Sequence, residues 1–218
     1  SSLYVFFSII IGLLFSEGIL RIKHNIVPNY DIEMWKYAKE LKTQSTNKLI
    51  GHVHIKNKSA KLQNVLVKIN KFGQRDINYD NKKLNNYDKS FLIIGSSITL
   101  GWGVKSENTF SSKLNELSKK EKKNWIFING GIGNYNTERY INNYLENWKD
   151  LDFTDLLIQF FVNDTENLRN IKEPNFFVEH FHLGVISWKL FNSYKSKFNS
   201  EKIDEYYKSL YSDDNEGS

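Results

Sequence analysis

The chain has 218 residues, a formal net charge of +5 at pH 7 and no cysteine. Its length allows one sizeable domain with an appendage, and the lack of cysteine excludes disulfides and thiolate metal sites. The lysines are scattered among Asn, Ile and Tyr rather than gathered on one patterned element, so the charge does not indicate nucleic-acid binding. The first residue is Ser1 and the last residues are polar, so we expect a piece of a longer protein.

The first segment is strongly apolar. No residue from Leu3 to Phe15 is charged, and Ile19 and Leu20 extend the stretch beyond Glu17. A helix needs about 20 mostly apolar residues to cross a bilayer, and no small-x-small cleavage motif follows this segment. The sequence therefore predicts a retained transmembrane anchor over residues 1–23 rather than a removed signal peptide.

Residues 24–90 predict a helix, a small β appendage and a linker. The amphipathic run 31–42 indicates the helix, with Asp31 as its N-cap. Alternating apolar residues indicate two strands, within 52–58 and 64–76. Residues 76–90 are polar without periodicity and predict the linker.

The pair His52 and His54 permits a metal hypothesis, because residues i and i+2 of a strand share a face. No further carboxylate or histidine stands at a useful spacing. A solvated strand face is therefore the preferred interpretation, and we expect no metal or other cofactor.

The rest of the chain is organised around residues 91–104. The apolar run Phe91 to Ile94 fits a strand buried on both faces of a parallel sheet. It ends in Gly95-Ser96-Ser97, and ligands of open α/β sheets bind beyond the carboxyl ends of the strands. A serine hydroxyl is thus predicted at an accessible edge, the alternative being that these residues serve only as a turn.

Two further strand and helix units follow. Helical periodicity and short apolar runs predict, in order, a crossover helix, a second strand, a second helix and a third buried strand, over residues 106–120, 125–131, 137–150 and 155–165. The order favours right-handed parallel connections and hence a doubly wound α/β fold. Beyond it the sequence predicts a loop and helical segments, and the missing strands of this thin sheet are expected beyond Ser218.

The ends of the three strands resemble the sequence blocks of the SGNH, or GDSL-type, hydrolases. G-S-S-I-T-x-G resembles the nucleophile block, with Ser97 in the nucleophile position and Ser96 in place of the usual aspartate. N-G-G-I-G-N resembles N-x-G-x-x-G, with Asn134 in place of the last glycine. V-N-D resembles the end of G-x-N-D, with Asn163 in the asparagine position and Phe161 in that of the glycine.

This resemblance implies a flavodoxin-like three-layer α/β/α SGNH fold over residues 91–218, incomplete at its C-terminus. It implies Ser97 as the nucleophile, and the backbone N–H groups of Ser97 and Asn134 with the Asn163 amide as oxyanion donors. Asparagine tolerates positive φ better than other non-glycine residues, which favours a retained backbone donor at position 134. The N-x-x-G-x-R-like segment at 70–75 and the anchor resemble the membrane-attached branch of the family.

The fourth block of the family, D-x-x-H, is missing from this sequence. The histidine of that block acts as the general base, and serine without a base is a poor nucleophile. Glu179 and His182 form E-x-x-H, but where the family has a loop. We expect the base beyond Ser218.

The resemblance implies a single-pass, membrane-anchored serine esterase or O-acyltransferase with an extracytoplasmic domain, periplasmic or at the cell surface. Its substrate would be a small-molecule or carbohydrate ester, such as O-acetyl groups of envelope carbohydrate. The departures at Ser96, Asn134 and Phe161 motivate an alternative, a catalytically inactive binding or assembly subunit of an envelope polysaccharide-modifying complex. A flavodoxin-like nucleotide binder is disfavoured, because no Gly-rich phosphate loop opens a helix after the first strand.

Overall fold

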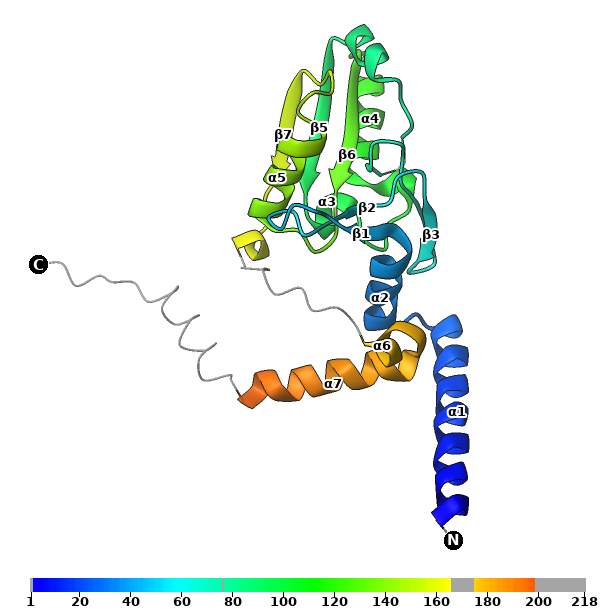
Figure 1. The fold of residues 1–218 in the computed structure, drawn as a ribbon. Coiled ribbons are helices and arrows are strands. Elements are labelled where there is room, and N and C mark those ends of the chain that lie inside the picture. Colours follow the sequence, from blue (N-terminus) through cyan, green and yellow to red (C-terminus); the bar gives the residue numbers. More distant parts are fainter. Residues whose placement is uncertain (1, 76, 166–174, 199–218) are drawn as a thin grey trace, which may run out of the picture. The chain divides into compact units, whose positions relative to one another are not determined.

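The structure is a computed structural model that describes residues 2–75, 77–165 and 175–198. The chain divides into two compact units, one formed by Ser1–Ile32 with Pro174–Ser218 and the other by Glu33–Glu173. Figure 1 shows the elements of each. The helical fragment predicted at 201–211 lies outside the described residues.

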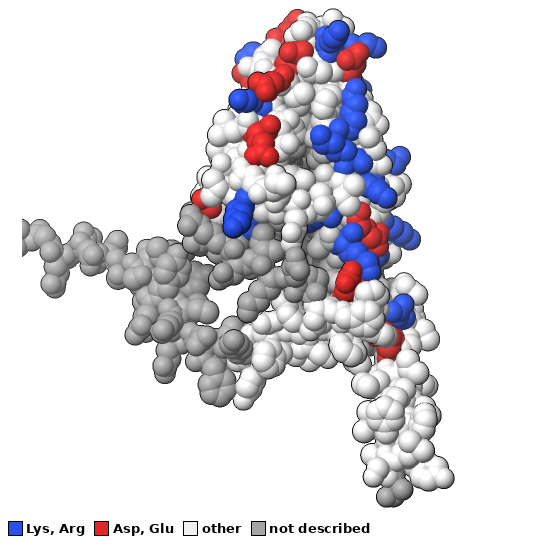
Figure 2. All heavy atoms as spheres, viewed as in Figure 1, with Lys and Arg blue, Asp and Glu red and all other residues white. Residues whose placement is uncertain are grey.

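The first unit is helical. It contains α1 (Ser2–Ile26), α6 (Phe176–His180) and α7 (His182–Phe198), so the segment predicted as a loop after residue 174 is a short helix that leads into α7. Helix α1 is 25 residues long and is long and apolar enough to cross a membrane, a property that a signal sequence shares. Its charged side chains lie toward its C-terminal end, as Figure 2 shows on the face in view. The predicted N-terminal apolar helix is confirmed, and it ends three residues later than expected, at Ile26.

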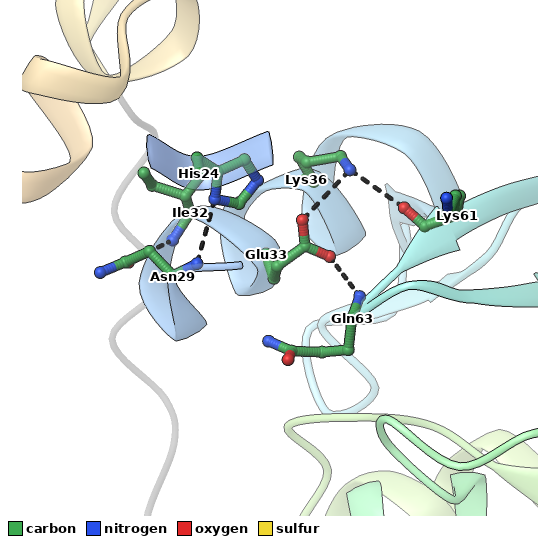
Figure 3. Close-up of polar contacts among 7 residues, drawn as sticks. All are labelled: His24, Asn29, Ile32, Glu33, Lys36, Lys61 and Gln63. Carbon is green, nitrogen blue, oxygen red and sulfur yellow. Dashed lines mark hydrogen bonds and ion pairs between the residues drawn. The ribbon is translucent and has the colours of Figure 1, made fainter. Parts of the chain in front are cut away.

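The first turn of α2 (Tyr30–Leu41) belongs to the same unit and is capped by Asn29. Oδ1 of Asn29 accepts hydrogen bonds from the N–H groups of Asp31 and Ile32 at 3.0 and 3.2 Å. The N–H of Asn29 donates to Nδ1 of His24 at 3.0 Å (Figure 3). An Asx side chain before the first helical residue satisfies N–H groups that have no intrahelical acceptor. The prediction of Asp31 as the N-cap is therefore wrong.

The second unit is built on a parallel three-stranded sheet of order β6-β5-β7. The strands are β5 (Lys89–Gly95), β6 (Trp125–Gly131) and β7 (Asp155–Gln159). Leu92, Ile93 and Ile94 of the central strand are at most 1% exposed, as a run of apolar residues without alternation requires. The mixed α/β class and the parallel pairing of the three predicted strands are confirmed.

Strand β7 departs from its prediction. It ends at Gln159, and residues Val162–Thr165 form the 3-10 turn η3. Leu156 and Ile158 are 38% and 47% exposed, so among the described residues this strand is an edge strand rather than a buried one. The apolar run alone could not distinguish the two, because it carries no information on what covers each face.

Helices α4 (Phe110–Lys120) and α5 (Thr137–Asn147) connect the strands. Each begins after a capping side chain, Thr109 for α4 and Asn136 for α5. Tyr140 of α5 packs in one core with Leu92 and Ile94. The crossover helices occur where the 3.6-residue periodicity places them.

The segment before the sheet contains two hairpins and a 3-10 turn. Strand β1 (Lys42–Gln44) pairs with β2 (His52–His54), and β3 (Ser59–Leu62) pairs with β4 (Val65–Lys68), both antiparallel. The two predicted strands thus do not pair with each other, and each has a partner that the sequence did not reveal. The predicted linker contains the 3-10 turn η1 (Asn81–Asn86) and the start of β5.

The part of α2 from Glu33 onward holds the β3–β4 hairpin. Carboxylate oxygens of buried Glu33 accept from the N–H of Gln63 and from Nζ of Lys36, and the latter also donates to the carbonyl of Lys61 at 3.0 Å (Figure 3). Apolar residues of α2 and the hairpin form a second core with Leu100, which follows the end of β5: Tyr37, Leu41, Ala60, Leu62, Val67 and Ile69. These early elements therefore pack against the short helix that begins with the predicted nucleophile, Ser97.

Candidate functional site

The carboxyl ends of the three parallel strands form one edge. Gly95 of β5 is in register with Gly131 of β6 and with Gln159 of β7. The three segments of the predicted site leave the sheet at or just after these residues. The strand ends that the sequence predicted to be neighbours are neighbours.

Ser97 is the first residue of the short helix α3 (Ser97–Leu100) and is half-buried. Ser96 before it is buried and extended, and its side chain makes no capping hydrogen bond. The first N–H groups of a helix have no intrahelical acceptor, and the N–H of Ser97 donates to no described residue. A hydroxyl and a backbone donor therefore stand together at this strand end.

Two glycines let α3 lie directly on the strand ends. A Cβ at position 95 would meet Oγ1 of Thr99 at 2.1 Å, and a Cβ at position 131 would meet the backbone N of Leu100 at 2.1 Å. Neither strand could end in a larger residue without displacing α3. The position of Ser97 is thus set by backbone contact with β6 and side-chain contact with β5.

Arg75 fixes the loop after α3. Its side chain is 1% exposed and donates to three backbone carbonyls, those of Leu100, Gly101 at 2.7 Å and Val104 at 2.6 Å. Its own N–H donates to the carbonyl of Asn129 at 2.9 Å. A guanidinium presents several donors in a rigid fork, so one residue satisfies the carbonyls at the C-terminus of α3. The sequence indicated Arg75 only through the N-x-x-G-x-R-like segment.

Asn129 joins the first two predicted blocks. Its Nδ2 donates to the carbonyl of Thr99 at 2.8 Å, and its Oδ1 accepts from the N–H of Gly131 at 2.9 Å. The side chain is buried. This asparagine therefore holds α3 against the end of β6 and is a positioning residue.

Asn134 has a φ of 64°, the left-handed region that glycine adopts most readily. Asparagine in place of the glycine of the resembled block is compatible with the turn, as the sequence predicted. The residue is exposed, its carbonyl accepts from Nη1 of Arg139 at 3.0 Å, and its N–H donates to no described residue. A second backbone donor therefore stands on the loop that leaves β6.

The preceding residue, Gly133, is held by a buried polar network. Its N–H donates to the Tyr37 hydroxyl at 2.8 Å, and that hydroxyl lies 2.7 Å from Nε2 of His54. Nδ1 of His54 lies 2.9 Å from the carbonyl of Gly73. Because a carbonyl can only accept, His54 carries its proton on Nδ1 and accepts the Tyr37 proton at Nε2. The N–H of Gly133 is thus already engaged and does not face a ligand.

The carbonyl of Gly133 accepts two further hydrogen bonds, from Nζ of Lys42 at 2.7 Å and from Nε2 of His52 at 3.1 Å. Burial lowers the pKa of His52 to about 2 and that of His54 to about 3. Burial also lowers the pKa of Lys42 to about 7. Both histidines are neutral structural groups, and the predicted solvated strand face is wrong. Among the described residues, no group of three His, Cys, Asp or Glu is placed to hold a metal.

Asn163 lies in η3, directly after β7. Its side chain lies outside the described part of the structure, so its predicted amide role stays a prediction. Asp164 is buried, and its Oδ2 accepts from the N–H of Phe161 at 3.0 Å. The aspartate therefore fixes the turn on which Asn163 stands.

Two buried polar atoms near the first and third strand ends have no hydrogen-bond partner among the described residues. They are Oγ1 of Thr99 and Oε1 of Gln159. A buried polar group left unpaired costs about 1–3 kcal/mol, and such groups in a native structure need an explanation. Thr99 is the threonine of the G-S-S-I-T-x-G block, which assigned it no role, and no sequence pattern indicated Gln159.

No described histidine donates to or accepts from the Ser97 hydroxyl. Glu179 lies in α6 and His182 is the first residue of α7. Both residues belong to the first unit. The base expected beyond Ser218 lies outside the described residues.

The segments that leave this edge thus carry a serine hydroxyl and two backbone N–H groups without a described acceptor, on a frame fixed by Arg75 and Asn129. Comparisons with protein-family models, with curated proteins and with solved structures found no match to this chain.

Proposed function

We propose that the protein is a membrane-anchored serine esterase or O-acyltransferase of the SGNH type, with Ser97 as its nucleophile. One observation carries the proposal. Ser97 begins α3 at the carboxyl edge of the sheet, and its N–H and the N–H of Asn134 donate to no described residue. This is the pair of backbone donors that the resemblance assigns to the oxyanion hole.

In the proposed reaction, Oγ of Ser97 attacks the carbonyl carbon of an ester while a base takes the hydroxyl proton. The carbonyl oxygen becomes an oxyanion that accepts from the N–H groups of Ser97 and Asn134 and from the Asn163 amide. Collapse of the intermediate returns the proton to the leaving alcohol and leaves an acyl-serine. Attack by water releases the acid, whereas attack by another hydroxyl transfers the acyl group.

Helix α1 supports the membrane attachment, because 25 residues at about 1.5 Å each exceed the ~30 Å thickness of a hydrocarbon core. A single-pass anchor with an extracytoplasmic domain, at the periplasm or cell surface, is the proposed topology. An O-acyl ester of envelope carbohydrate is the proposed substrate, and neither metal nor cofactor takes part in the reaction.

Covalent labelling tests the nucleophile. The complete natural protein is treated with a fluorophosphonate probe, beside Ser97→Ala and Ser96→Ala. We expect Ser97→Ala to abolish labelling without loss of the folded state, and Ser96→Ala to retain it, because both are small substitutions at adjacent serines and only Ser97 is the nucleophile. Labelling that persists in Ser97→Ala, or an unlabelled wild-type protein that is folded, would reject the proposal.

The alternative is an inactive binding or assembly subunit of an envelope complex. It is favoured by the observation that no described histidine hydrogen-bonds to Ser97. The complete reading frame distinguishes the two functions, because the enzyme requires a histidine that can reach Ser97. An unlabelled, folded protein without D-x-x-H downstream is the result expected of the alternative.

A further inference from the structure

An acidic residue of α1 binds the start of α7 in the first unit, beside a hydrogen bond from Nη2 of Arg21 to the carbonyl of His180 at 3.2 Å. Oε1 of Glu17 accepts from the N–H of His182 at 3.0 Å, and Oε2 accepts from the N–H of Leu183 at 2.8 Å. Glu17 is 7% exposed and also accepts from Nε of Arg21 at 2.7 Å. A carboxylate that binds the first N–H groups of a 17-residue helix satisfies donors that have no intrahelical acceptor. Glu17 therefore fixes the start of α7 against α1.

The position of Glu17 along α1 fixes the depth of α7 in a bilayer. Residues 2–16 contain no charged side chain, and 15 residues at about 1.5 Å each span ~22 Å of an apolar core that is ~30 Å thick. Glu17 and Arg21 are the first charged residues after this stretch. The N-terminus of α7 is thus attached where α1 leaves the hydrocarbon.

Helices α6 and α7 expose a set of large apolar side chains, which we call the interfacial surface. In Figure 1, α7 runs across the axis of α1 rather than along it. A helix attached in this way to an anchor lies along the membrane plane when the anchor crosses the membrane. Trp and Tyr are enriched at the membrane–water interface. The surface consists of Phe176, Phe177, Trp188, Leu190, Phe191 and Tyr194, which are 52–67% exposed.

An apolar groove of about 400 Å³ lies between α1 and the α6–α7 pair. Its wall on α1 reaches from Glu17 back to Ile10, about 10 Å toward the N-terminus at 1.5 Å per residue. This matches the ~5–10 Å to which interfacial helices bury their apolar side chains. The other apolar lining residues are Leu13, Leu14, Phe177, Phe181 and Leu183.

We propose that α6 and α7 lie in the headgroup–acyl boundary of the leaflet where α1 leaves the membrane, with a phospholipid acyl chain in the groove. The proposal rests on the membrane-spanning role of α1 and is independent of the chemistry at Ser97. The occupant is lipid because the groove is lined both by the uncharged stretch of α1 and by apolar residues of α6 and α7, at the depth that Glu17 sets. If a second copy of the chain filled the groove, the groove would not need to lie at the depth that Glu17 sets.

Depth-dependent quenching tests the proposal in the complete natural protein. The sequence has no cysteine, and any cysteine elsewhere in the complete protein is replaced by serine, so single cysteines can carry an environment-sensitive fluorophore. The variants are Leu190→Cys on α7, Leu13→Cys on α1 and Leu117→Cys on α4. The two exposed leucines form a matched pair, because Leu190 is 66% and Leu117 is 53% exposed and Leu117 lies among the surface ion pairs of α4.

The proteins are reconstituted into vesicles of phosphatidylcholine and phosphatidylglycerol with a nitroxide at a shallow or a deep acyl position. We expect the Leu190→Cys probe to lose most of its fluorescence to the shallow nitroxide, the Leu13→Cys probe to lose more to the deep one, and the Leu117→Cys probe to be unaffected. Phe191→Cys provides a second α7 position and is expected to follow Leu190→Cys.

Quenching at position 13 without quenching at positions 190 and 191 would overturn the proposal and leave the anchor intact. No quenching at any of these positions would overturn both the proposed position of α6 and α7 and the membrane anchor. A probe at position 190 that is shielded from water, insensitive to nitroxide and dependent on protein density would show a second copy on this surface instead. Fluorophosphonate labelling of Ser97 in the same vesicles is scored separately, so failure of the enzyme function is distinguishable.

Discussion

Single buried residues decide the chemistry of the loop that carries Asn134. The Tyr37 hydroxyl accepts from Gly133 and donates to His54, whose other ring nitrogen donates to Gly73. Each group has one role, which permits only one arrangement of protons. A charged His54 would have to donate at Nε2, against the Tyr37 proton, so protonation breaks this chain of hydrogen bonds.

The stability of the protein should therefore depend on pH through His54. Its pKa is about 3 in the folded state against 6.5 ordinarily, mainly because of burial. Between these values the unfolded chain binds a proton that the folded chain does not, so the free energy of unfolding falls as pH decreases from 6.5. His54→Gln should reduce the slope of the free energy of unfolding against pH by up to ~1.4 kcal/mol per pH unit. Urea unfolding in detergent between pH 4 and 7 measures it.

His180→Gln is the control for this experiment, because His180 is exposed on α6. This variant leaves the hydrogen bonds of Tyr37, His54 and Gly73 in place, so the change expected of His54→Gln should be absent from it. His54→Gln should also lower the free energy of unfolding at pH 7 by about 1–3 kcal/mol, since it disrupts the hydrogen bonds of buried groups. An unchanged slope in His54→Gln would show that His54 is not held neutral.

At the scale of elements, the candidate site depends on how closely α3 approaches β6. A Cβ on residue 131 would stand 2.1 Å from the N of Leu100 and 2.5 Å from the carbonyl carbon of Thr99. These are backbone atoms, so the overlap is relieved only by moving α3. Gly131→Ala should lower the free energy of unfolding by about 2–4 kcal/mol and reduce the labelling of Ser97. Urea unfolding and probe labelling measure the two effects.

Gly103→Ala separates this overlap from backbone strain. Gly103 has a φ of +71°, and the nearest atom to a Cβ there is 3.7 Å away. The expected cost is that of the left-handed conformation alone, about 1–2 kcal/mol. If Gly131→Ala is no more destabilising than Gly103→Ala, close packing of α3 on β6 does not position the nucleophile.

The whole molecule consists of two compact units, each held together by a different kind of contact. The helices of the first unit are joined by a few contacts, among which Glu17 binds the first N–H groups of α7, whereas the second unit has an apolar core around its sheet. A change at Glu17 should therefore loosen α6 and α7 without affecting β5. This separation follows from the contacts within each unit.

Glu17→Gln tests it by hydrogen exchange of the complete protein. The amide keeps one acceptor oxygen but loses the other and the charge, so the first turn of α7 should lose ~1 kcal/mol of stabilisation. Amides at 182–190 should then exchange about five-fold faster, with no change in 89–95. Ser16→Ala, which removes only a bond from Oγ to the carbonyl of Gly12, should behave as wild type. Equal protection in both variants would show that Glu17 does not hold α7.

The sequence by itself determined the elements whose signal is local. Apolar runs and helical periodicity located β5, β6, α4, α5 and the N-terminal helix, because each pattern reports the burial of its own segment. The order of strands and helices then placed Ser97 and the Asn129–Asn134 loop at one edge, since parallel strands share their carboxyl ends.

Only the tertiary structure decided what surrounds those elements. His52 binds Gly133 across 81 positions of the chain, and Arg75 binds carbonyls 25 to 29 positions away. The partner strands β1 and β3, the exposure of β7 and the bond from Glu17 to α7 likewise depend on distant residues. No local pattern encodes such pairings, because a hydrogen bond or a packed face is completed by whichever segment the whole fold brings against it.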